Sequence, residues 1–322
     1  MHALLVKTSS LGDVVHNLPV VTDIQRHNPG AIIDWVVEEA FADIPRLHPG
    51  VHRVIPVAIR RWRKQLFVAD TWRDMAACRR ALREDFYDVV LDSQGLIKSA
   101  VIAWQTQLAT KGRRLGYAKA VVREPFAASF YDAGYVIPKN MHAVERNRQL
   151  AAAAFGHTLE GELDYGIAAV PLAASWLPTK PYAVLLTGTS RADKLWPESD
   201  WVALAQALKI SVILPAGSAE ERERAQRLAA QIPDAIAAPP LGIAELAGLL
   251  TGAQIVIGLD SGLTHLAVAL NKPTLAIFSG STPGLTGVHA GPSLANAAIN
   301  LGRKGVPPTV TEVVASARNL LR

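Results

Sequence analysis

The first polar segment of the chain, KTSSLGD at residues 7–13, contains a single carboxylate, Asp13. It follows the apolar run ALLV (3–6) and precedes more apolar sequence, an order typical of a strand, a turn and a helix. A lone aspartate at such a turn could be a general base that deprotonates an attacking hydroxyl group. It could equally cap the helix that follows. Three other polar side chains flank it: Lys7, Ser9 and Ser10.

A loop rich in hydroxyl groups follows the predicted strand YAVLL (182–186) in the second half. Thr189 and Ser190 could donate hydrogen bonds to the oxygens of a diphosphate, and Lys194 could offset the charge of a leaving group. Pro197 indicates that a helix begins directly afterwards. An ordinary hydrophilic loop has the same composition, so this interpretation depends on neighbouring loops.

The sequence DSGLTH (260–265) opens a predicted apolar helix after another strand. Backbone amides near Ser261 and Gly262 would then lie at a helix N-terminus, where the helix dipole favours an anion. His265 lies one turn further on and could face the same ligand. Alternatively, Asp260 is only a helix cap and His265 a core residue with its hydrogen bonds satisfied.

Glu221 follows a third strand, SVILP (211–215), and a glycine turn. Its carboxylate could accept hydrogen bonds from two ribose hydroxyl groups. A glutamate in the first turn of a helix is also favoured by the helix dipole alone. Since three successive strand ends carry groups suited to phosphate or ribose, the second half is predicted to bind a nucleotide diphosphate.

The elements that would hold these loops alternate between strand and helix patterns, which predicts parallel sheets with helices on both faces. We expect two such α/β domains, residues 1–167 and 182–322, joined by a proline-rich linker at 168–181. The helix at 309–321 could pack on either domain. Ligands of open parallel sheets bind beyond the carboxyl ends of strands, so a cleft between the two sheets is the expected site. The predicted strands are 3–6, 32–37, 53–57, 88–92, 135–138, 182–186, 211–215, 254–259 and 274–278.

Composition indicates a soluble protein with substantial cores. The chain has 322 residues, half of them hydrophobic, and a mean hydropathy of +0.18. No apolar run approaches the roughly 18–20 residues that span a bilayer, and the first apolar run is too short for a signal peptide. The single cysteine, Cys78, excludes an internal disulfide and favours a reducing compartment. We therefore expect a cytoplasmic protein.

Positive charge is concentrated in the first half, although the net charge is only +5. Residues 46–83 contain ten Lys or Arg and two acids, and residues 111–123 contain five bases and no acid. This asymmetry predicts an anionic partner, although a merely solvated basic surface would look similar. The segment RRWRK (60–64) interleaves an aromatic residue with bases, but no nucleic-acid recognition module accompanies it. Gln94 and Lys98 follow the strand at 88–92 and add polar groups to the same half.

Several familiar site motifs are missing from the sequence. It contains no D-x-D for a sugar-nucleotide metal, no C-x-x-C, no H-E-x-x-H and no G-x-G-x-x-G. We expect no metal and no cofactor, with Lys194 and helix-end amides meeting the leaving-group charge instead. The missing dinucleotide motif also disfavours an epimerase or dehydrogenase. A non-catalytic adaptor for anionic lipid or nucleic acid would leave the polar loops of the second half unexplained.

Six motifs, in order along nearly the whole chain, resemble those of the lipopolysaccharide heptosyltransferases. Within that family, R-R-W-R-K and H-A-V-E-R favour the branch that adds the first heptose to the Kdo region over the branch that adds the second. The alternative is a member of the same family that acts on a later inner-core acceptor. The motifs are KTSSLGD (7–13), RRWRK (60–64), DSQGLIKS (92–99), HAVER (142–146), DKLWP (193–197) and DSGLTH (260–265).

The resemblance implies a GT-B fold: two Rossmann-like domains, with the acceptor on the first and the donor on the second. It also implies inverting, metal-independent transfer from ADP-L-glycero-β-D-manno-heptose to Kdo₂-lipid A, with Asp13 as the base and Lys194 at the leaving group. The implied donor-binding residues are Thr189, Ser190, Lys194, Glu221, Leu241, Asp260, Ser261, Gly262 and His265. The residues assigned to the acceptor are Lys7, Ser9, Ser10, Arg60, Arg61, Arg63, Lys64, Gln94, Lys98, Arg123 and His142.

A lipid acceptor places the expected enzyme at a membrane. We expect peripheral contact between the basic surface and the anionic cytoplasmic face of the bacterial inner membrane. No nucleic-acid partner is expected. Domain closure would complete the site and exclude water from the reactive sugar nucleotide. Two positions depart from the family pattern while keeping its hydroxyl groups, Ser190 and Ser261, and Leu241 stands where a methionine is usual.

Overall fold

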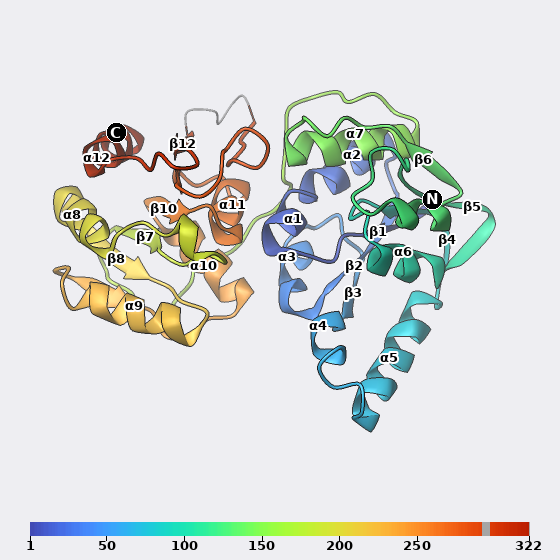
Figure 1. Cartoon of the computed structure of the whole chain (residues 1–322), viewed down its shortest axis with the longest axis horizontal. Coiled ribbons are helices and arrows are strands. Elements are labelled where there is room, and N and C mark those ends of the chain that lie inside the picture. The colour runs from blue at the N-terminus through green and yellow to red at the C-terminus, as the bar shows by residue number, and fades with distance from the viewer. Residues whose placement is uncertain (292–296, 322) are drawn as a thin grey trace. The chain divides into compact units, whose positions relative to one another are not determined.

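The computed structural model describes residues 1–291 and 297–321, which form two compact units (Figure 1). The N-terminal unit comprises Met1–Gly161 and Tyr165–Ile167. The C-terminal unit comprises Glu162–Asp164 and Ala168–Arg322. Among the described residues, no helix is both long enough and apolar enough to cross a membrane.

The sheet of the N-terminal unit is six-stranded over the described residues and entirely parallel. Its order is β3-β2-β1-β4-β5-β6, so the chain reverses its direction of winding between β1 and β4. The central strands are apolar because helices cover both faces, and Trp35 is fully buried among them. The strands are β1 (His2–Val6), β2 (Ile32–Glu38), β3 (Arg53–Val57), β4 (Phe86–Asp92), β5 (Gln107–Tyr117) and β6 (Ala133–Tyr135).

The helices of this unit cover the sheet; all but α7, which follows the last strand, lie between consecutive strands. They are α1 (Leu11–Val15), α2 (Leu18–His27), α3 (Asp43–Arg46), α4 (Ile59–Trp62), α5 (Ala69–Leu82), α6 (Ile97–Trp104) and α7 (Ala143–Phe155). Two 3₁₀ turns complete the unit, η1 (Glu39–Phe41) and η2 (Pro125–Phe130). Helix α7 ends at Gly156, whose φ of 71° is the left-handed conformation that glycine adopts without a steric cost.

The C-terminal unit repeats this topology. Over the described residues its parallel sheet has the order β12-β11-β10-β7-β8-β9, with the reversal of winding between β7 and β10. The strands are β7 (Tyr182–Leu186), β8 (Ser211–Leu214), β9 (Ala235–Ala237), β10 (Ile255–Leu259), β11 (Thr274–Phe278) and β12 (Ala298–Gly302). The helical elements are η3 (Ala192–Lys194), α8 (Glu198–Leu208), α9 (Ala219–Ala229), α10 (Ile243–Gly252), α11 (Gly262–Ala269) and α12 (Val310–Leu320).

The last helix, α12, packs on the C-terminal unit, which settles a point that the sequence left open. Val313 and Ala317 are fully buried in the same core cluster as Trp201 and Leu204 of α8. The indole Nε1 of Trp196 donates to the carbonyl of Pro308, 3.2 Å away, just before α12 begins. Burial of one apolar stripe therefore anchors this helix.

The segment predicted as a linker, 168–181, is grouped with the C-terminal unit. The amide of Leu172 donates to the carbonyl of Gly248 in α10 at 3.1 Å. A side chain at Gly248 would collide with this segment, because its Cβ would lie 2.8 Å from the carbonyl oxygen of Val170. The segment thus lies against α10, and the domain limits proposed from sequence remain a prediction.

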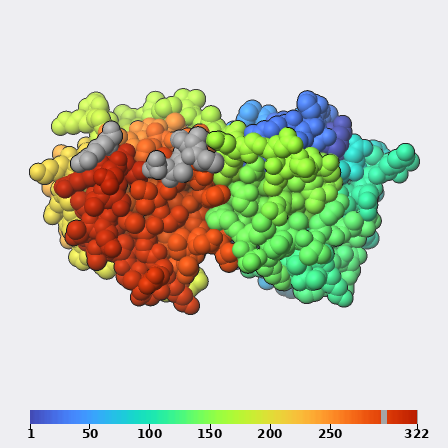
Figure 2. Space-filling model, turned by 90° about the horizontal axis from the view of Figure 1, so that it is seen from above, coloured from blue at the N-terminus to red at the C-terminus, as the bar shows by residue number. Residues whose placement is uncertain are grey.

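Two kinds of difference separate the predicted strands from the observed ones. The run at 135–138 is wrong beyond Tyr135, because β6 ends there. Strands β5, β9 and β12 have no counterpart among the predictions. Strand β5 is long but rich in Lys and Arg, its register against β4 shifts between Tyr87 and Val89, and its blue-green early residues project from the unit in Figure 2. Edge and near-edge strands need little apolar sequence, so hydrophobic patterning does not reveal them.

Candidate active site

Asp13 lies in the loop and short helix that follow β1, at the reversal point of the N-terminal sheet. Its Oδ2 accepts hydrogen bonds from the backbone N and the Oγ of Ser10, at 2.8 and 3.1 Å. These bonds form a capping box for α1, so Asp13 does stabilise a helix start. Among the described residues, Oδ1 accepts no hydrogen bond. One carboxylate oxygen is therefore held and the other is available to accept a proton.

The loop after β4 holds the loop after β1 in place. Gln94 is buried, and its Oε1 accepts hydrogen bonds from the backbone amides of Thr8 and Ser9, both at 3.1 Å. Lys98 donates from Nζ to the Oγ of Ser9 at 3.1 Å. Adjacent strands β1 and β4 thus bring these predicted residues together. Gln94 thus orients the backbone just before Asp13, and its contact with an acceptor stays a prediction.

Lys7 is almost completely buried, with 6% exposure. Its ammonium group donates to the carbonyl of Ser93 at 2.8 Å and to Oδ1 of Asn147 at 3.4 Å. Burial lowers the pKa of Lys7, and the carboxylates of Asp13 and Asp92 act in the opposite direction. Its influence on the site is accordingly electrostatic: it places a partly desolvated positive charge near the Asp13 carboxylate.

The basic segment 60–64 forms α4 and the turn after it. Arg61 differs from its neighbours because it is bound by two acids, Glu39 at 3.0 Å and Asp74 at 2.7 Å. Within the described residues, Arg63 and Lys64 form no ion pair, and both are exposed. The guanidinium of Arg60 lies over the ring of Phe41, 5.2 Å from its centroid. Three of the four predicted cations therefore remain available to an anion.

Arg60 and Arg63 are also close enough to Lys98 to influence its titration. Burial lowers the pKa of Lys98, Glu38 raises it, and both arginines lower it further. This mutual repulsion shows that cations from α4 and α6 converge on one region. A polyanion bound there would relieve the repulsion, which favours an anionic ligand at this edge of the sheet.

Arg123 and His142, which were predicted to bind the acceptor, lie near the segment that follows β1. Arg123 is exposed, and its charge acts on Lys7. His142 caps α7 by accepting from the amide of Val144 at 3.2 Å, and its ring meets that of His16 edge-on at 5.7 Å. His142 thus caps α7, and its contact with a ligand stays a prediction.

The residue assignments missed two neighbours of Lys7, Arg146 and Asn147, although Arg146 belongs to the quoted motif HAVER. The guanidinium of Arg146 lies 4.2 Å from the ring centroid of Tyr117, and its charge also acts on Lys7. Asn147 is buried, receives a hydrogen bond from Lys7 and donates to the carbonyl of His16 at 3.2 Å. Their side chains reach this region only because α7 packs beside β5.

In the C-terminal unit, the loops after β7 and β10 meet at the reversal point of the sheet. Lys194 donates from Nζ to Oδ2 of Asp260 at 2.6 Å, and both side chains are mostly buried. The Oγ1 of Thr189 donates to the carbonyl of Asp260 at 3.1 Å. Ser190, the next residue of the loop after β7, is exposed. The residues that the sequence assigned to a diphosphate therefore do converge.

Asp260 is the electrostatic centre of this cluster. Burial alone would raise its pKa, but the neighbouring His265 ring and hydrogen bonds from Lys194 and Ser281 outweigh burial and hold the pKa well below its usual range. Ser281 donates to the same Oδ2 as Lys194, at 2.5 Å, and its part was not predicted. Asp260 is thus ionised at neutral pH, and its hydrogen bond holds Lys194 in place.

Helix α11 begins directly beside this cluster, with Ser261 as its N-cap. The first amides of a helix have no partner within the helix and attract anions. His265 is buried and its Nε2 lies 3.8 Å from Oδ1 of Asp260. A diphosphate approaching Gly262 would therefore meet helix amides and the Lys194 ammonium together.

Glu221 links the loop after β8 to the loop after β7. Its Oε2 accepts from the amides of Gly217 and Ser218, at 2.8 and 3.1 Å, as part of the capping box of α9. Its Oε1 lies so close to Gly188 that a Cβ there would be 2.3 Å away. Glu221 therefore caps a helix, and its other oxygen lies beside the loop after β7; its contact with a ribose stays a prediction. Leu241 lies half-buried just before α10.

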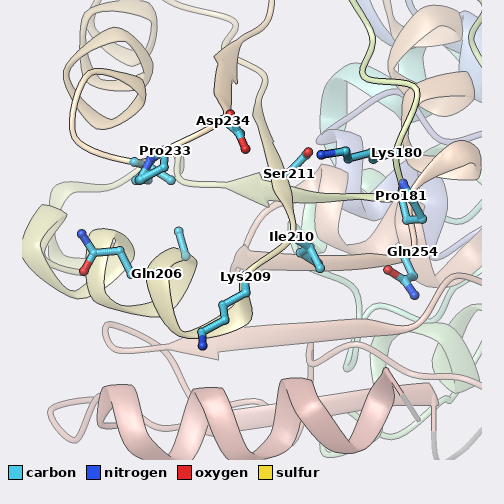
Figure 3. A pocket seen from close by; sticks show the side chains of 11 residues that line it. Lys180, Pro181, Gln206, Lys209, Ile210, Ser211, Pro233, Asp234 and Gln254 are labelled. Carbon is cyan, nitrogen blue, oxygen red and sulfur yellow. The ribbon is translucent and has the colours of Figure 1, made fainter.

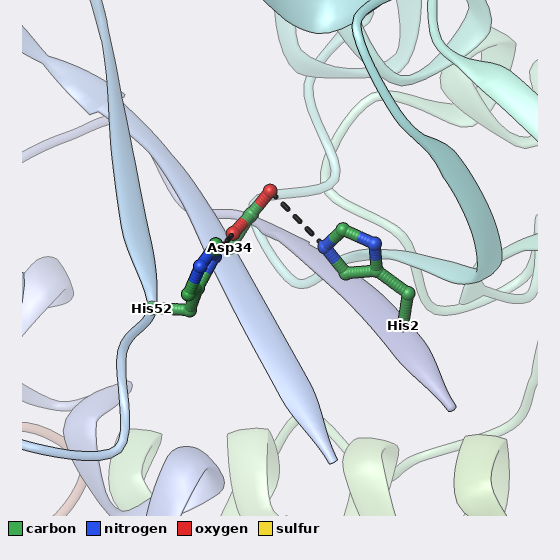
Figure 4. Close-up of side chains that lie close together, drawn as sticks. All are labelled: His2, Asp34 and His52. Atoms are coloured by element: carbon green, nitrogen blue, oxygen red, sulfur yellow. Dashed lines mark hydrogen bonds and ion pairs between the residues drawn. The ribbon is translucent and has the colours of Figure 1, made fainter.

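A possible cation site lies at the opposite edge of the N-terminal sheet. His2, Asp34 and His52 bring their ligand atoms within 4.8 Å of one another (Figure 4). However, Arg53 also binds Oδ2 of Asp34, at 3.0 Å, and Tyr87 donates to it at 2.9 Å. A metal ion would therefore have to sit beside a guanidinium group, so we assign this cluster a structural role.

We expect Asp34→Asn to lower the free energy of unfolding by about 3 kcal/mol at pH 7, the usual cost of breaking a buried ion pair. Burial acts to raise the pKa of Asp34, but hydrogen bonds from His52, Tyr87 and Arg53 outweigh burial, so that the folded-state pKa lies below its ordinary value. This stability is present above the unfolded-state pKa and is lost as pH falls through the lower folded-state pKa. Urea unfolding should show that the difference in free energy of unfolding between wild type and Asp34→Asn is smaller near pH 3 than at pH 7. Asp88→Asn, which changes an exposed carboxylate, is the control.

A cavity of about 500 Å³ opens at the N-terminal ends of β7 and β8, where Lys180, Ser211 and Asp234 line it (Figure 3). It lies at the edge of the sheet opposite the Lys194–Asp260 cluster. Ligands of doubly wound sheets bind at the carboxyl ends of the strands. We therefore do not assign this cavity to the nucleotide site.

Two Rossmann-like units, each with polar loops at the reversal point of its sheet, define a GT-B glycosyltransferase. A model of glycosyltransferase family 9 (heptosyltransferase) matches residues 75–313. The chain therefore belongs to glycosyltransferase family 9, and within it to the lipopolysaccharide heptosyltransferases.

Known relatives agree with this assignment. The chain is 48% identical to lipopolysaccharide heptosyltransferase 1 of Pseudomonas aeruginosa, over 90% of this chain and 81% of that protein. The structure matches the E. coli heptosyltransferase WaaC solved with ADP, with a TM-score of 0.89, 38% identity and coverage of 99% and 100% of the two chains. WaaC solved with ADP-2-deoxy-2-fluoro heptose matches with a TM-score of 0.82, 39% identity and coverage of 99% and 98%. The likeness supports transfer of the heptosyltransferase 1 type.

Proposed function

We propose that this glycosyltransferase moves L-glycero-D-manno-heptose from ADP-heptose to the Kdo region of Kdo₂-lipid A, with inversion and without a metal ion. One observation carries the donor assignment: Lys194, Glu221, Asp260 and the start of α11 converge at the strand ends of the C-terminal sheet. The E. coli relatives solved with ADP and with an ADP-heptose analogue support the same ligand here.

In the proposed reaction, Oδ1 of Asp13 takes the proton of a Kdo hydroxyl group as that oxygen attacks the anomeric carbon of the heptose. The bond between that carbon and the diphosphate oxygen breaks, and ADP leaves from the opposite face with the electron pair. Lys194 and the first amides of α11 stabilise the charge that develops on the diphosphate. These groups perform the task that a metal ion would otherwise perform.

The acceptor belongs to the basic edge of the N-terminal unit. Arg60, Arg63 and Lys64 offer cations for the carboxylates and phosphates of Kdo₂-lipid A, and Lys98 adds a fourth. The enzyme would work as a peripheral protein at the cytoplasmic face of the inner membrane, where an anionic leaflet attracts such a surface.

An ADP-release assay in EDTA tests the function. Wild type is incubated with ADP-heptose and with deacylated Kdo₂-lipid A, and in parallel with an acceptor that already carries the first heptose. Release with the first acceptor alone is the expected result. Release only with the second would transfer the assignment to a later step of the inner core, and restoration of activity only by added Mg²⁺ would refute metal independence.

Gly188→Ala should raise the KM for ADP-heptose about tenfold, the effect of losing one hydrogen bond to a charged group. The new Cβ would lie 2.3 Å from Oε1 of Glu221, so the carboxylate must move away from the ribose it is proposed to bind. Initial rates at varied donor concentration measure the effect. Gly284→Ala is the matched control, because no atom of the described part of the chain lies within 4 Å of a Cβ there. An unchanged KM would remove Glu221 from the donor site.

A further inference from the structure

An apolar surface projects from the N-terminal unit where α5 begins. We call Leu66, Phe67, Val68 and Trp72 the apolar tip. Their exposed fractions are 47%, 105%, 45% and 58%, so Phe67 is as exposed as a side chain in an extended peptide. Figure 1 shows the start of α5 extending from the body of this unit as a spur. Large apolar side chains gathered on one projecting surface indicate an interaction site.

The apolar tip is a folded turn. The indole Nε1 of Trp72 donates to the carbonyl of Leu66 at 2.9 Å. The amides of Val68 and Thr71 donate to the carbonyls of Gln65 and Val68, both at 3.0 Å. These bonds hold the aromatic residues outward in a defined shape, so their exposure does not result from a lack of structure.

The charge around the apolar tip is positive. The exposed cations closest to the tip along the chain are Arg60, Arg63, Lys64 and Arg73, whereas Arg79, Arg80 and Arg83 lie at the other end of α5. The two acids between residues 60 and 83 are both used internally, since Asp70 binds Arg73 and Asp74 binds Arg61. Apolar side chains surrounded by cations complement an anionic lipid surface, which takes the apolar groups into its interface and attracts the cations.

The apolar surface continues beyond the tip into a groove of about 310 Å³ between α4, α5 and α6. Leu66 belongs to both. The groove is lined by apolar side chains that include Met75, Leu82, Val101 and Ile102, together with the cations Arg63, Arg79 and Lys98. Apolar and cationic side chains thus line one groove that adjoins the tip through Leu66.

We propose that the apolar tip inserts into the interface of an anionic membrane, with the surrounding cations on its headgroups. The proposal rests on the proposed function, because a lipid acceptor brings the enzyme to a membrane. It adds the surface that makes the contact: helix α5, about 21 Å long, presents its first turn to the lipid. The basic segment 60–64 then lies next to the headgroup region, where the phosphates of the acceptor are found.

Vesicle flotation at low salt tests this inference with the full chain and lipid alone. Wild type should float with phosphatidylcholine vesicles that contain phosphatidylglycerol and much less with phosphatidylcholine alone. Phe67→Asp should weaken the partition about tenfold or more, because an inserted aromatic ring becomes a charge. Phe86→Asp is the matched control: Phe86 is 61% exposed at the start of β4, away from the tip, and its exchange should leave flotation unchanged.

A fluorescence measurement reports insertion directly. In Phe67→Trp, vesicles whose acyl chains carry bromine should quench the emission that this variant adds to wild type. Equal flotation of wild type and Phe67→Asp, or no extra quenching, would overturn the proposal. Sedimentation without lipid tests whether the tip binds a second copy of the chain instead. A dimer that dissociates in Phe67→Asp would assign the tip to that contact and overturn the proposal.

The soluble assay separates this inference from the proposed function. Phe67→Asp should release ADP at the wild-type rate with deacylated acceptor, because Phe67 has no part in the binding of either substrate. With acylated acceptor in vesicles, its rate should fall with its membrane partition. Wild type that transfers heptose but binds no anionic vesicle would refute only the tip, and vesicle binding without transfer would refute only the proposed function.

Discussion

Asp13→Asn is expected to lower kcat for heptose transfer by about 10²- to 10⁴-fold, the usual contribution of a positioned general base. An asparagine oxygen can still accept from the backbone amide of Ser10, which lies 2.8 Å from Oδ2 in the wild type. The cap of α1 is therefore retained while the proton acceptor is lost. The rate of ADP release at saturating donor and acceptor measures the effect.

Asp13→Ala separates the two tasks of this carboxylate. It removes both the base and the capping box, so it should also lower the free energy of unfolding by about 1 kcal/mol. Asp43→Asn, which loses only a surface ion pair with Arg46, serves as the control for charge and should transfer heptose normally. Ordinary turnover by Asp13→Asn, with intact folding, would exclude Asp13 as the base.

Lys194→Ala is expected to reduce kcat/KM about 10²- to 10³-fold, as the loss of one preorganised group opposite a developing charge does. The ammonium lies 2.6 Å from Asp260 and beside the start of α11, where the diphosphate is proposed to bind. Its removal also takes from Asp260 one of the hydrogen bonds that hold its pKa low. Kinetics with ADP-heptose and calorimetric titration with ADP measure the two consequences.

The comparison of rate with ADP affinity distinguishes catalysis from simple binding. If Lys194 acts mainly on the leaving group, kcat should fall by a larger factor than the affinity for ADP. Lys304→Ala removes an exposed cation of the same unit and should change neither quantity. A Lys194→Ala enzyme with an unchanged kcat would mean that helix amides alone stabilise the departing diphosphate.

Much of the fold follows from local pattern. Strands such as Tyr182–Leu186 and Thr274–Phe278 appear in the sequence with their observed limits because central parallel strands are continuous apolar runs. The carboxyl ends of these strands identified the loops that contain Asp13, Lys194 and Asp260. Residue chemistry and the position of a residue along a strand were sufficient to predict these loops as the site.

Other features depend on contacts between segments far apart in the chain. Ser281 and Arg146 reach their sites because strand order brings distant loops together, and no local pattern encodes that order. The sequence also does not distinguish Lys7, which the fold buries, from an exposed lysine. Strand β5 was not predicted because its sequence is basic and has no strand-like apolar pattern. It forms because its partner β4 pairs with it through backbone hydrogen bonds.

The sequence by itself determined the kinds of groups available at the site, the two α/β repeats and the position of the cations in the first half. Only the tertiary structure decided which groups are free to act. Arg61 is bound by two acids while Arg63 is free of any ion pair in the described chain, although the two are neighbours in one motif. The reason is physical: hydrogen bonding and burial depend on what the fold places opposite a side chain, and composition does not contain that information.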